Sequence, residues 1–375
     1  MDRSAPALSI GRSEDDGAPI VITEGELLEG IAVGGPPGGG KRSVLLALLA
    51  RQVARGGGAV FLEGRPSRRA LGAFLAAAEQ ADRLDVVRLY EPSTPSRSHR
   101  YNPLAGKGLA PLASLLLHLG APPARRAGSA VDGATRRGAE ALVAGLLDEG
   151  GPLTLAAVRR RLAESEPSDR RRLARAQAGL PVVGPATWRR RLAQELDRLL
   201  MNDGAAPLMA ESNEIDLGAV VEGGGLLYVG LGVVADEALA ASLAALVLAD
   251  LRVAIESRPA PAMPLLLLLD TAEAYLVPPL LGLLEASPRT ALAPVVSLAD
   301  AGLQGGSPLA AQVLARMPAR LAHRITLAAA SEGRRPGSGV VELAGRPPRR
   351  AALALEDAPA QPERTEALRT RLLAR

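Results

Sequence analysis

The sequence predicts an α/β protein with a mostly parallel, doubly wound sheet. Short apolar runs alternate with helical patterns on both sides of a middle stretch that contains no convincing strand, and such alternation is typical of βαβ units. A glycine-rich loop follows the strand predicted at 30–34 and precedes a helix. Hydrophobic residues make up 47% of the chain, so it can build a large core although only 2% of its residues are aromatic.

The N-terminal third supplies the first half of the predicted sheet. The glycine triplet at 56–58 ends the first long helix, because glycine is the usual residue just past a helix C-terminus. In chain order the expected elements are strands at 19–23 and 30–34, a helix at 43–55, a strand at 59–63, a helix at 68–81 and a strand at 86–90.

The middle of the chain is predicted to be an all-α insertion. Helical patterns are expected at 134–147, 155–164 and 188–200, separated by glycine and proline. The α/β alternation then resumes with strands at 226–231, 265–269, 292–297 and 339–343 and helices at 236–255 and 276–286. The predicted domains are an α/β domain formed by 1–106 and 206–350, the all-α insertion at 107–205, and a tail at 351–375 that contains a charged helix.

The loop Gly34-Gly35-Pro36-Pro37-Gly38-Gly39-Gly40-Lys41-Arg42-Ser43 predicts a phosphate-binding loop. In such a P-loop the backbone N–H groups surround phosphates, the helix N-terminus adds its dipole, and the lysine reaches the terminal phosphates. Lys41 is one of two lysines among 44 cationic residues, which indicates a position that needs a compact ammonium. The alternative is a flexible glycine turn before an ordinary helix. The candidate nucleotide-binding residues are Gly35, Gly38, Gly39, Gly40, Lys41, Arg42 and Ser43.

Five leucines at 265–269 end in Asp270. In P-loop ATPases an aspartate at the end of a buried strand (the Walker B position) binds Mg²⁺, whereas an aspartate just past a strand is also common as a helix N-cap. The combination with Lys41 favours the metal-binding interpretation. We expect the strands that precede Lys41 and Asp270 to be neighbours in the sheet.

The composition excludes several classes of site. The chain has no cysteine, so disulfides, thiol catalysis and cysteine metal sites are excluded, and its three histidines are far apart in the sequence. The N-terminus lacks the apolar core of a signal peptide. The stretch nearest to a membrane span, 108–124, is broken by prolines and shorter than the roughly 18–20 apolar residues that a spanning helix needs. We expect a cytoplasmic protein with no membrane span of its own.

Positive charge is concentrated in the predicted insertion. Residues 107–205 contain sixteen Lys and Arg against ten Asp and Glu, so this region carries +6 and the rest of the chain −2. Arginine runs occur at 159–161, 170–172 and 189–191. These runs are either solvated helix faces in an arginine-rich sequence or a surface for the phosphate backbone of DNA.

Taken in order, these motifs resemble the TraD/TraG coupling ATPases of conjugation and type IV secretion, which are related to the HerA/FtsK translocases. The segment Ser98-His99-Arg100-Tyr101-Asn102-Pro103-Leu104 is similar to that family's HS-x-YNPL. Further matching segments are 55–64, 214–217, 225–231, 274–278, 297–300 and 312–314. The resemblance implies a RecA-like core, ATP and Mg²⁺ bound between the subunits of a homo-hexamer, and DNA, relaxosome or secretion-system proteins as partners.

The sequence departs from this family at the positions that serve hydrolysis. Arg42 replaces the hydroxyl residue that binds Mg²⁺, and Ser43, about 100° further round the helix, cannot simply substitute for it. Thr271 replaces the glutamate that polarises the attacking water, Val296 the glutamine that senses the γ-phosphate, and Arg316 a family asparagine.

Two further catalytic candidates come from the resemblance. Glu273 lies two residues beyond Thr271, and a helical turn could bring it near the site. Arg289 matches an arginine that the family presents to the neighbouring subunit's nucleotide, although an arginine there can also be a surface cation at a helix C-terminus.

The sequence therefore favours a nucleotide-binding protein that resembles a DNA-translocating ATPase, in which nucleotide and Mg²⁺ binding are weakened and hydrolysis is weak or lost. The alternative is a catalytically inactive scaffold or substrate adaptor of a secretion or conjugation system. A P-loop enzyme of another class, such as a kinase, is more remote, because the 98–104 segment and the α insertion argue against it.

Overall fold

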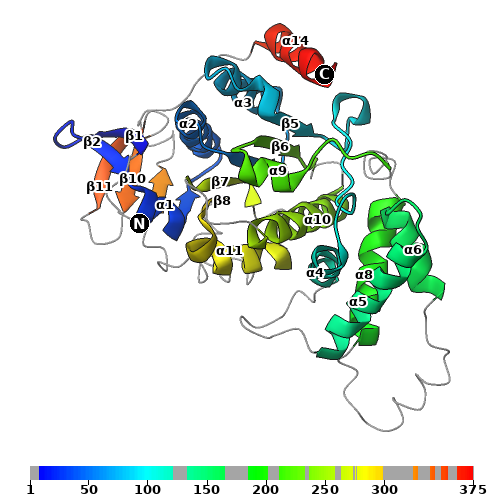
Figure 1. Cartoon of the computed structure of the whole chain (residues 1–375). Helices are drawn as coiled ribbons and strands as arrows, with labels where there is room; N and C mark the ends of the chain where they lie inside the picture. Colours follow the sequence, from blue (N-terminus) through cyan, green and yellow to red (C-terminus); the bar gives the residue numbers. More distant parts are fainter. Residues whose placement is uncertain are drawn as a thin grey trace.

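The structure is a computed structural model that describes residues 8–120, 133–164, 185–201, 211–232, 236–257, 263–272, 275, 277–298, 324–327, 338–342, 348–353 and 361–374. Its strands are β1 (Leu8–Ser13), β2 (Pro19–Ile22), β3 (Ile31–Gly34), β4 (Ala59–Glu63), β5 (Val87–Tyr90), β6 (Leu226–Gly230), β7 (Leu265–Asp270), β8 (Leu292–Leu298), β9 (Arg324–Leu327), β10 (Ser338–Glu342) and β11 (Arg349–Leu353). They form one sheet in the order β2-β1-β11-β10-β9-β3-β8-β7-β4-β6-β5 (Figure 1).

The larger part of this sheet is parallel. β3, β8, β7, β4, β6 and β5 pair in parallel, and β9 is parallel to β3. Six of these strands were predicted from their apolar runs, and their residues are buried almost throughout, as expected for strands covered by helices on both faces. The predicted fold class, a RecA-like α/β core with a mostly parallel sheet, is confirmed.

One detail of the predicted topology is wrong. The strands that precede Lys41 and Asp270 are not neighbours, because β8 lies between β3 and β7 and pairs with both. All seven residues of β8 are buried, so its apolar sequence suits a central position between two other strands.

The other part of the sheet is an antiparallel extension formed by β2, β1, β11, β10 and β9. Of these strands only β2 and β10 were predicted. β9 has four residues, and β11 begins with the exposed Arg349 and Arg350, so neither shows the apolar run that marked the central strands. β11 also crosses residue 351, where the sequence suggested that a separate tail begins.

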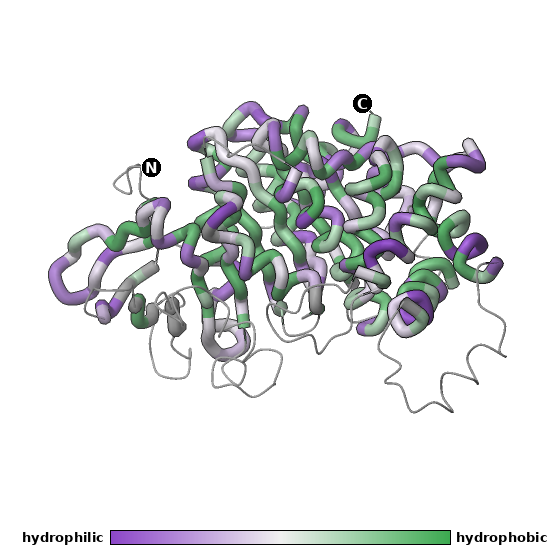
Figure 2. Tube along the Cα trace, turned by 60° about the horizontal axis from the view of Figure 1, so that its bottom comes forward, coloured by the Kyte–Doolittle hydropathy of each residue, from purple (hydrophilic) through white to green (hydrophobic). Residues whose placement is uncertain are grey.

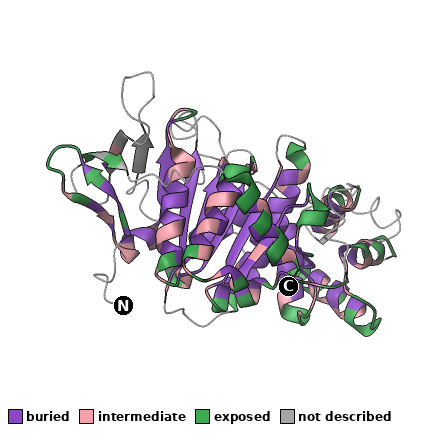
Figure 3. Ribbon diagram, turned by 90° about the horizontal axis from the view of Figure 1, so that it is seen from above, coloured by how far each residue is buried: buried purple, intermediate pink, exposed green. Residues whose placement is uncertain are grey.

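Helices cover both faces of the sheet. On one face lie α2 (Lys41–Ala54) and α3 (Arg68–Gln80), and on the other lie α10 (Glu237–Glu256) and α11 (Pro278–Thr290) (Figure 1). Alternate strand residues divide between two hydrophobic clusters, so that one set packs under α2 and α3 and the other under α10 and α11. Figure 3 shows the buried central strands beside a more exposed antiparallel extension, and Figure 2 shows hydrophobic segments concentrated in the interior.

Shorter helices complete the α/β part. They are α1 (Glu24–Glu29), α9 (Leu217–Glu222) and the 3₁₀ turns η1 (Leu84–Val86) and η2 (Pro95–Arg97). The C-terminal helix α14 (Pro362–Leu373) packs on the outer side of α3. Thr365 of α14 lies so close to Gly72 of α3 that a Cβ at this glycine would stand 2.6 Å from the threonine hydroxyl, and a buried ion pair joins Arg369 to Glu91.

The described part of the stretch between 107 and 205 contains helices and no strand. These helices are α4 (Leu109–Leu119), α5 (Gly133–Asp148), α6 (Leu155–Glu164) and α8 (Pro185–Leu200). The indole Nε1 of Trp188 donates to the Leu116 carbonyl at 3.1 Å, which holds α8 against α4. Residues of all four helices belong to the same hydrophobic cluster as α10, so the helical region shares a core with the α/β part.

Among the described helices, α10 is the one long and apolar enough to cross a membrane by length and composition. It is longer than the stretch at 108–124 that the sequence suggested as the nearest candidate. Within the structure, 78% of its most apolar window is buried, as expected for a helix that packs between the sheet and α4.

Candidate nucleotide site at the carboxyl edge of the sheet

The loop between β3 and α2 has the backbone that its glycines predict. Gly38 and Gly40 adopt φ angles of 79° and 98°, which residues with a side chain rarely adopt. A Cβ at Gly38 would meet nothing within 4 Å, so it is the backbone conformation and not lack of space that calls for glycine. α2 begins at Lys41, two residues earlier than predicted, and this places Lys41, Arg42 and Ser43 in its first turn.

Lys41 lies over its own loop. Its Nζ donates to the carbonyl oxygens of Gly35, at 2.5 Å, and Pro36, at 3.0 Å. The ammonium is therefore held at the mouth of the loop, where a P-loop lysine meets phosphate.

Arg42 points to the end of β7. Its Nε donates to Oδ2 of Asp270 at 2.9 Å, and its Nη2 lies 2.8 Å from the same oxygen. Nη2 also lies 3.0 Å from Oε1 of Glu63, at the end of β4. One guanidinium therefore bridges two carboxylates from two neighbouring strands.

The remaining contacts of Arg42 fix the guanidinium in place. Nη1 donates to Oγ of Ser67 at 3.0 Å, and Nη2 donates to the Arg65 carbonyl at 3.2 Å. Ser67 is the N-cap of α3, where its hydroxyl accepts from the Ala70 N–H. Arg42 thus ties the first turn of α2 to the start of α3.

Glu63 and Asp270 are side by side because β4 and β7 pair in register at these two residues. The Glu63 side chain is fully buried and that of Asp270 is 4% exposed. The Tyr228 hydroxyl donates to Oε2 of Glu63 at 2.5 Å, and the Ser297 hydroxyl donates to Oδ1 of Asp270 at 3.3 Å.

The electrostatics follow from this burial. Burial raises the pKa of Glu63 to about 7, although the charge of Arg42 and the hydrogen bond from Tyr228 both lower it. The pKa of Arg42 is raised, because the attraction of Glu63 and Asp270 outweighs the opposing effect of burial. The pair of carboxylates therefore depends on the guanidinium for its compensating charge.

Glu63, Tyr228 and Ser297 were not predicted as site residues. A signal for Glu63 was present, because it ends the buried strand β4 as Asp270 ends β7. Tyr228 and Ser297 lie inside β6 and β8, and only the order of the strands brings them to the two carboxylates.

The structure shows where two of the residues that depart from the TraD/TraG pattern lie. Thr271 follows Asp270 with φ 57°, a left-handed backbone that is a genuine outlier for a β-branched residue. Val296 is fully buried in the cluster that faces α10 and α11. The next residue on β8, Ser297, is the polar group that reaches Asp270. Glu273 and Arg316 lie outside the described residues.

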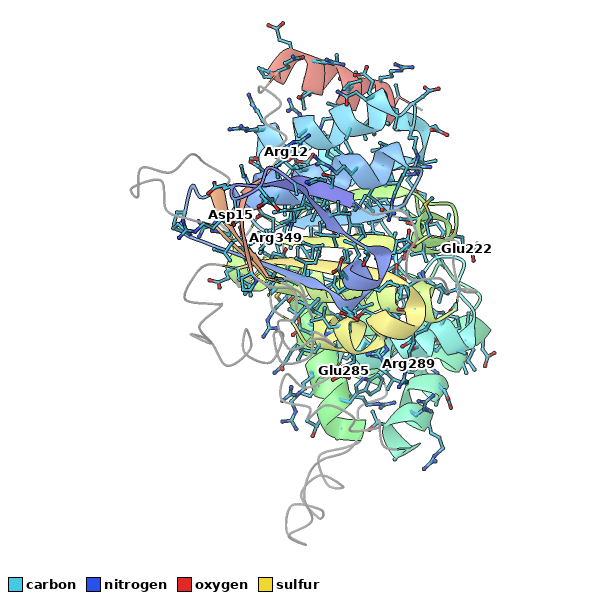
Figure 4. All side chains as sticks on the ribbon, turned by 90° about the vertical axis from the view of Figure 1, so that its left-hand side faces the viewer. Arg12, Asp15, Glu222, Glu285, Arg289 and Arg349 are labelled. Carbon is cyan, nitrogen blue, oxygen red and sulfur yellow. The ribbon has the colours of Figure 1, made fainter. Side chains whose placement is uncertain are left out.

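Two interpretations of single residues can be compared with the structure. Asp270 is not the N-cap of the next long helix, because α11 begins at Pro278 with Val277 as its N-cap. Arg289 is exposed in the last turn of α11, beside Glu285 in Figure 4. This turn leads into the start of β8, so Arg289 lies at the opposite edge of the sheet from the loop at 35–40.

The side chains at this edge do not fit Mg²⁺. Oxygen ligands are what this ion requires, but the position of the expected hydroxyl ligand holds Arg42, and its guanidinium contacts the carboxylate that would bind the metal. Among the described residues there is no group of three or more His, Asp or Glu that could hold a metal ion. The phosphate loop, by contrast, keeps the backbone and the lysine that an anionic phosphate needs.

Comparison with known proteins finds the same fold at low sequence identity. No protein family and no curated protein matches the sequence. Similar solved structures include the plasmid coupling protein TrwB in complex with ADP and Mg²⁺, with 14% identity, a TM-score of 0.65 and coverage of 96% of this chain and 92% of that one. TrwB in complex with a non-hydrolysable ATP analogue has 14% identity and a TM-score of 0.64, with coverage of 96% of this chain and 93% of that one. VirB4 of Thermoanaerobacter pseudethanolicus has 13% identity and a TM-score of 0.51, with coverage of 95% of this chain and 97% of that one.

Proposed function

We propose that this chain, which has the fold of the coupling ATPases of conjugation and type IV secretion, binds a nucleotide at the loop 35–43 and hydrolyses it slowly or not at all. The observation that carries this proposal is the contact of the Arg42 guanidinium with Asp270. A cation supplied by the protein lies against the carboxylate that the fold would use for its metal.

Nucleotide binding is supported by the loop itself. The positive φ angles of Gly38 and Gly40 leave the backbone N–H groups of the loop and of the first turn of α2 at the end of β3, where such groups bind phosphate. Lys41 contributes an ammonium at the same place. The related fold of TrwB has been solved with ADP and with nucleotide analogues.

Loss of hydrolysis is supported by replacements at the positions that serve it in the coupling ATPases. Arg42 and Thr271 stand where a metal ligand and a water-activating carboxylate would be needed, and Val296, which aligns with the γ-phosphate sensor, is buried in the cluster that faces α10 and α11. Groups of this kind act as a unit, so that the loss of one already removes most of the rate. Arg289 could act only on the nucleotide of a neighbouring subunit, because it lies at the opposite edge of the sheet.

The partners follow from the same proposal. We propose that the chain forms a cytoplasmic homo-hexamer. This assembly would act on DNA, the relaxosome or secretion-system proteins, and DNA would bind to the basic helical region. The alternative role, a scaffold or substrate adaptor without nucleotide turnover, is favoured by the occupation of the metal position by Arg42.

Nucleotide binding and turnover can be measured on the full chain. We expect Lys41→Ala to lose most of the affinity for a labelled nucleotide, and the unmodified chain to show no Mg²⁺-dependent turnover with or without single-stranded DNA. The combined variant Arg42→Thr and Thr271→Glu should raise turnover above either single change. Val296 is left unchanged, because a glutamine there would bury its amide in the apolar cluster that faces α10 and α11. DNA-stimulated turnover of about 1 s⁻¹ or more by the unmodified chain, the lower range of ordinary enzymes, would show that another group performs the chemistry.

A further inference from the structure

We infer that the site selects a nucleoside diphosphate, bound without Mg²⁺, over a nucleoside triphosphate. This inference rests on the proposed nucleotide binding and adds the class of ligand. The fold implies a bound Mg²⁺, but the side chains at the carboxyl ends of β4 and β7 do not fit this ion.

Arg42 has almost no hydrogen-bonding capacity left for a ligand. A guanidinium has five N–H groups. Nε is used by Asp270, Nη1 donates to Ser67, and Nη2 meets Asp270, Glu63 and the Arg65 carbonyl. At most one N–H, on Nη1, is left for a ligand. Arg42 therefore excludes a metal ion from the two carboxylates without offering the γ-phosphate the interactions that the metal would have provided.

The charges at this edge of the sheet are nearly balanced without a metal ion. Lys41 and Arg42 carry two positive charges, and the buried carboxylates of Asp270 and, above its pKa of about 7, of Glu63 supply the negative ones. In ordinary P-loop sites the metal bridges the β- and γ-phosphates and neutralises the charge of the γ-phosphate. Here that phosphate would approach two carboxylates whose compensating cation is already engaged, and repulsion between like charges is strong where water is scarce.

The site retains the groups that bind the α- and β-phosphates of a nucleotide. The α- and β-phosphates of a P-loop ligand are held by backbone N–H groups, and the lysine reaches the β-phosphate. The loop glycines, the free N-terminus of α2, which no side chain caps, and Lys41 are all present. The groups that serve the first two phosphates are therefore kept, whereas the groups that serve the third phosphate and its metal are replaced.

The inference is tested by equilibrium titration of the full chain with fluorescent N-methylanthraniloyl derivatives of ADP and ATP, each in EDTA and in Mg²⁺. We expect ADP to bind at least roughly 10-fold more tightly than ATP in EDTA, and Mg²⁺ to change the ADP affinity by less than about 2-fold. This comparison uses the unmodified protein, so it does not depend on how well any variant folds.

Two variants extend the test. Arg42→Thr supplies a hydroxyl and frees both carboxylates, so that Mg²⁺ should now raise ATP affinity by roughly 10-fold or more. Arg51→Thr, on the same helix α2, is the matched control, because Arg51 donates to the Ala47 carbonyl one turn earlier and not to Glu63 or Asp270. It should keep the metal-independent preference of the unmodified chain.

The possible failures are distinguishable. ATP that binds as tightly as ADP in EDTA, or unmodified protein whose ATP affinity depends strongly on Mg²⁺, would overturn this inference and leave nucleotide binding intact. Absence of binding by either nucleotide, under every condition, would overturn the proposed function itself.

Discussion

The carboxyl edge of the sheet and the helical region both pair arginine with carboxylates, but they do so at different depths. At the sheet edge Arg42 is 32% exposed, while the side chains of Glu63 and Asp270 are 0% and 4% exposed. In the helical region Arg159 and Asp197 are 34% and 38% exposed, and Arg161 and Glu149 are both 37% exposed. The arginines are therefore similarly exposed, and the two regions differ in the burial of the carboxylates.

This difference indicates which arginines contribute most to the stability of the folded chain. A buried carboxylate that loses its partner is costly, because neither water nor another cation can replace it, whereas an exposed ion pair exchanges its partner for water at little cost. The arginine run at 159–161 is in addition engaged with acids of the same region. Its members are thus partly neutralised before any DNA phosphate is considered.

The largest expected effect is on stability. Above about pH 7, Arg42→Ala should lower the free energy of unfolding by about 3–5 kcal/mol, because it leaves the buried carboxylates of Asp270 and Glu63 without a compensating cation. The matched control Arg159→Ala, which removes the partner of the half-buried Asp197, should cost less than about 1 kcal/mol. Urea denaturation of both variants measures the difference.

A second comparison shows whether the carboxylates are the cause. Adding Glu63→Gln and Asp270→Asn to Arg42→Ala removes both buried charges and should recover much of the stability. Equal losses of unfolding free energy in Arg42→Ala and Arg159→Ala would show that burial of the carboxylates does not decide the effect. A triple variant that is no more stable than Arg42→Ala would show the same.

A smaller effect is expected on DNA binding by the helical region. If Arg189, Arg190 and Arg191 on α8 meet phosphates, the variant with all three changed to alanine should bind duplex DNA more weakly. The log–log slope of affinity against salt should fall by about 0.9 for each phosphate that the variant no longer neutralises. Fluorescence anisotropy at several salt concentrations gives this slope.

The control for DNA binding is a set of three exposed arginines in another part of the molecule. Arg12, Arg349 and Arg350 lie on β1 and β11 of the antiparallel extension, away from the helical region, and Figure 4 shows the first two. Changing these three to alanine alters the net charge equally and should leave the slope nearer to that of the unmodified chain. Equal slopes for both variants would mean that the run at 189–191 is only a solvated helix face.

The smallest effect concerns the segment that leads from the α/β part into the helical region. The Leu89 N–H donates to Nδ1 of the buried His99 at 3.0 Å. Burial lowers the pKa of His99 from its ordinary 6.5, assisted by Arg88 and opposed by the Leu89 carbonyl oxygen, 3.3 Å from Nδ1, and by Glu214.

The unfolded chain therefore binds more protons than the folded chain just below pH 6.5, so stability is present above this pH and falls as the pH falls through the folded pKa. The raised pKa of Glu63 acts in the opposite direction over this range, so the effect of His99 is measured as a difference between two chains. From about pH 7.5 to 5.5 the melting temperature of the unmodified chain should fall slightly relative to that of His99→Gln, whose amide oxygen can still accept the Leu89 N–H. An unchanged pH dependence in that variant would assign the loss to other groups.

The sequence by itself determined most of the fold. The leucines of β7 and the apolar runs of β4, β6 and β8 are short and alternate with longer helical patterns, which favours buried strands over helices. The glycines around Lys41 likewise specify a backbone that other residues resist. These are local properties, because they depend on the residue and its near neighbours, and the P-loop and the fold class could therefore be predicted.

Only the tertiary structure decided how the site is assembled. The sequence identified Arg42 as a missing hydroxyl ligand and Asp270 as a metal ligand, 228 residues apart, without indicating that the two residues pair with each other. That pairing, and the presence of Glu63, depend on β4 lying next to β7 and on β8 separating β7 from β3. Strand order is set by the packing of whole helices and strands against one another, and no local pattern around any of these residues encodes it.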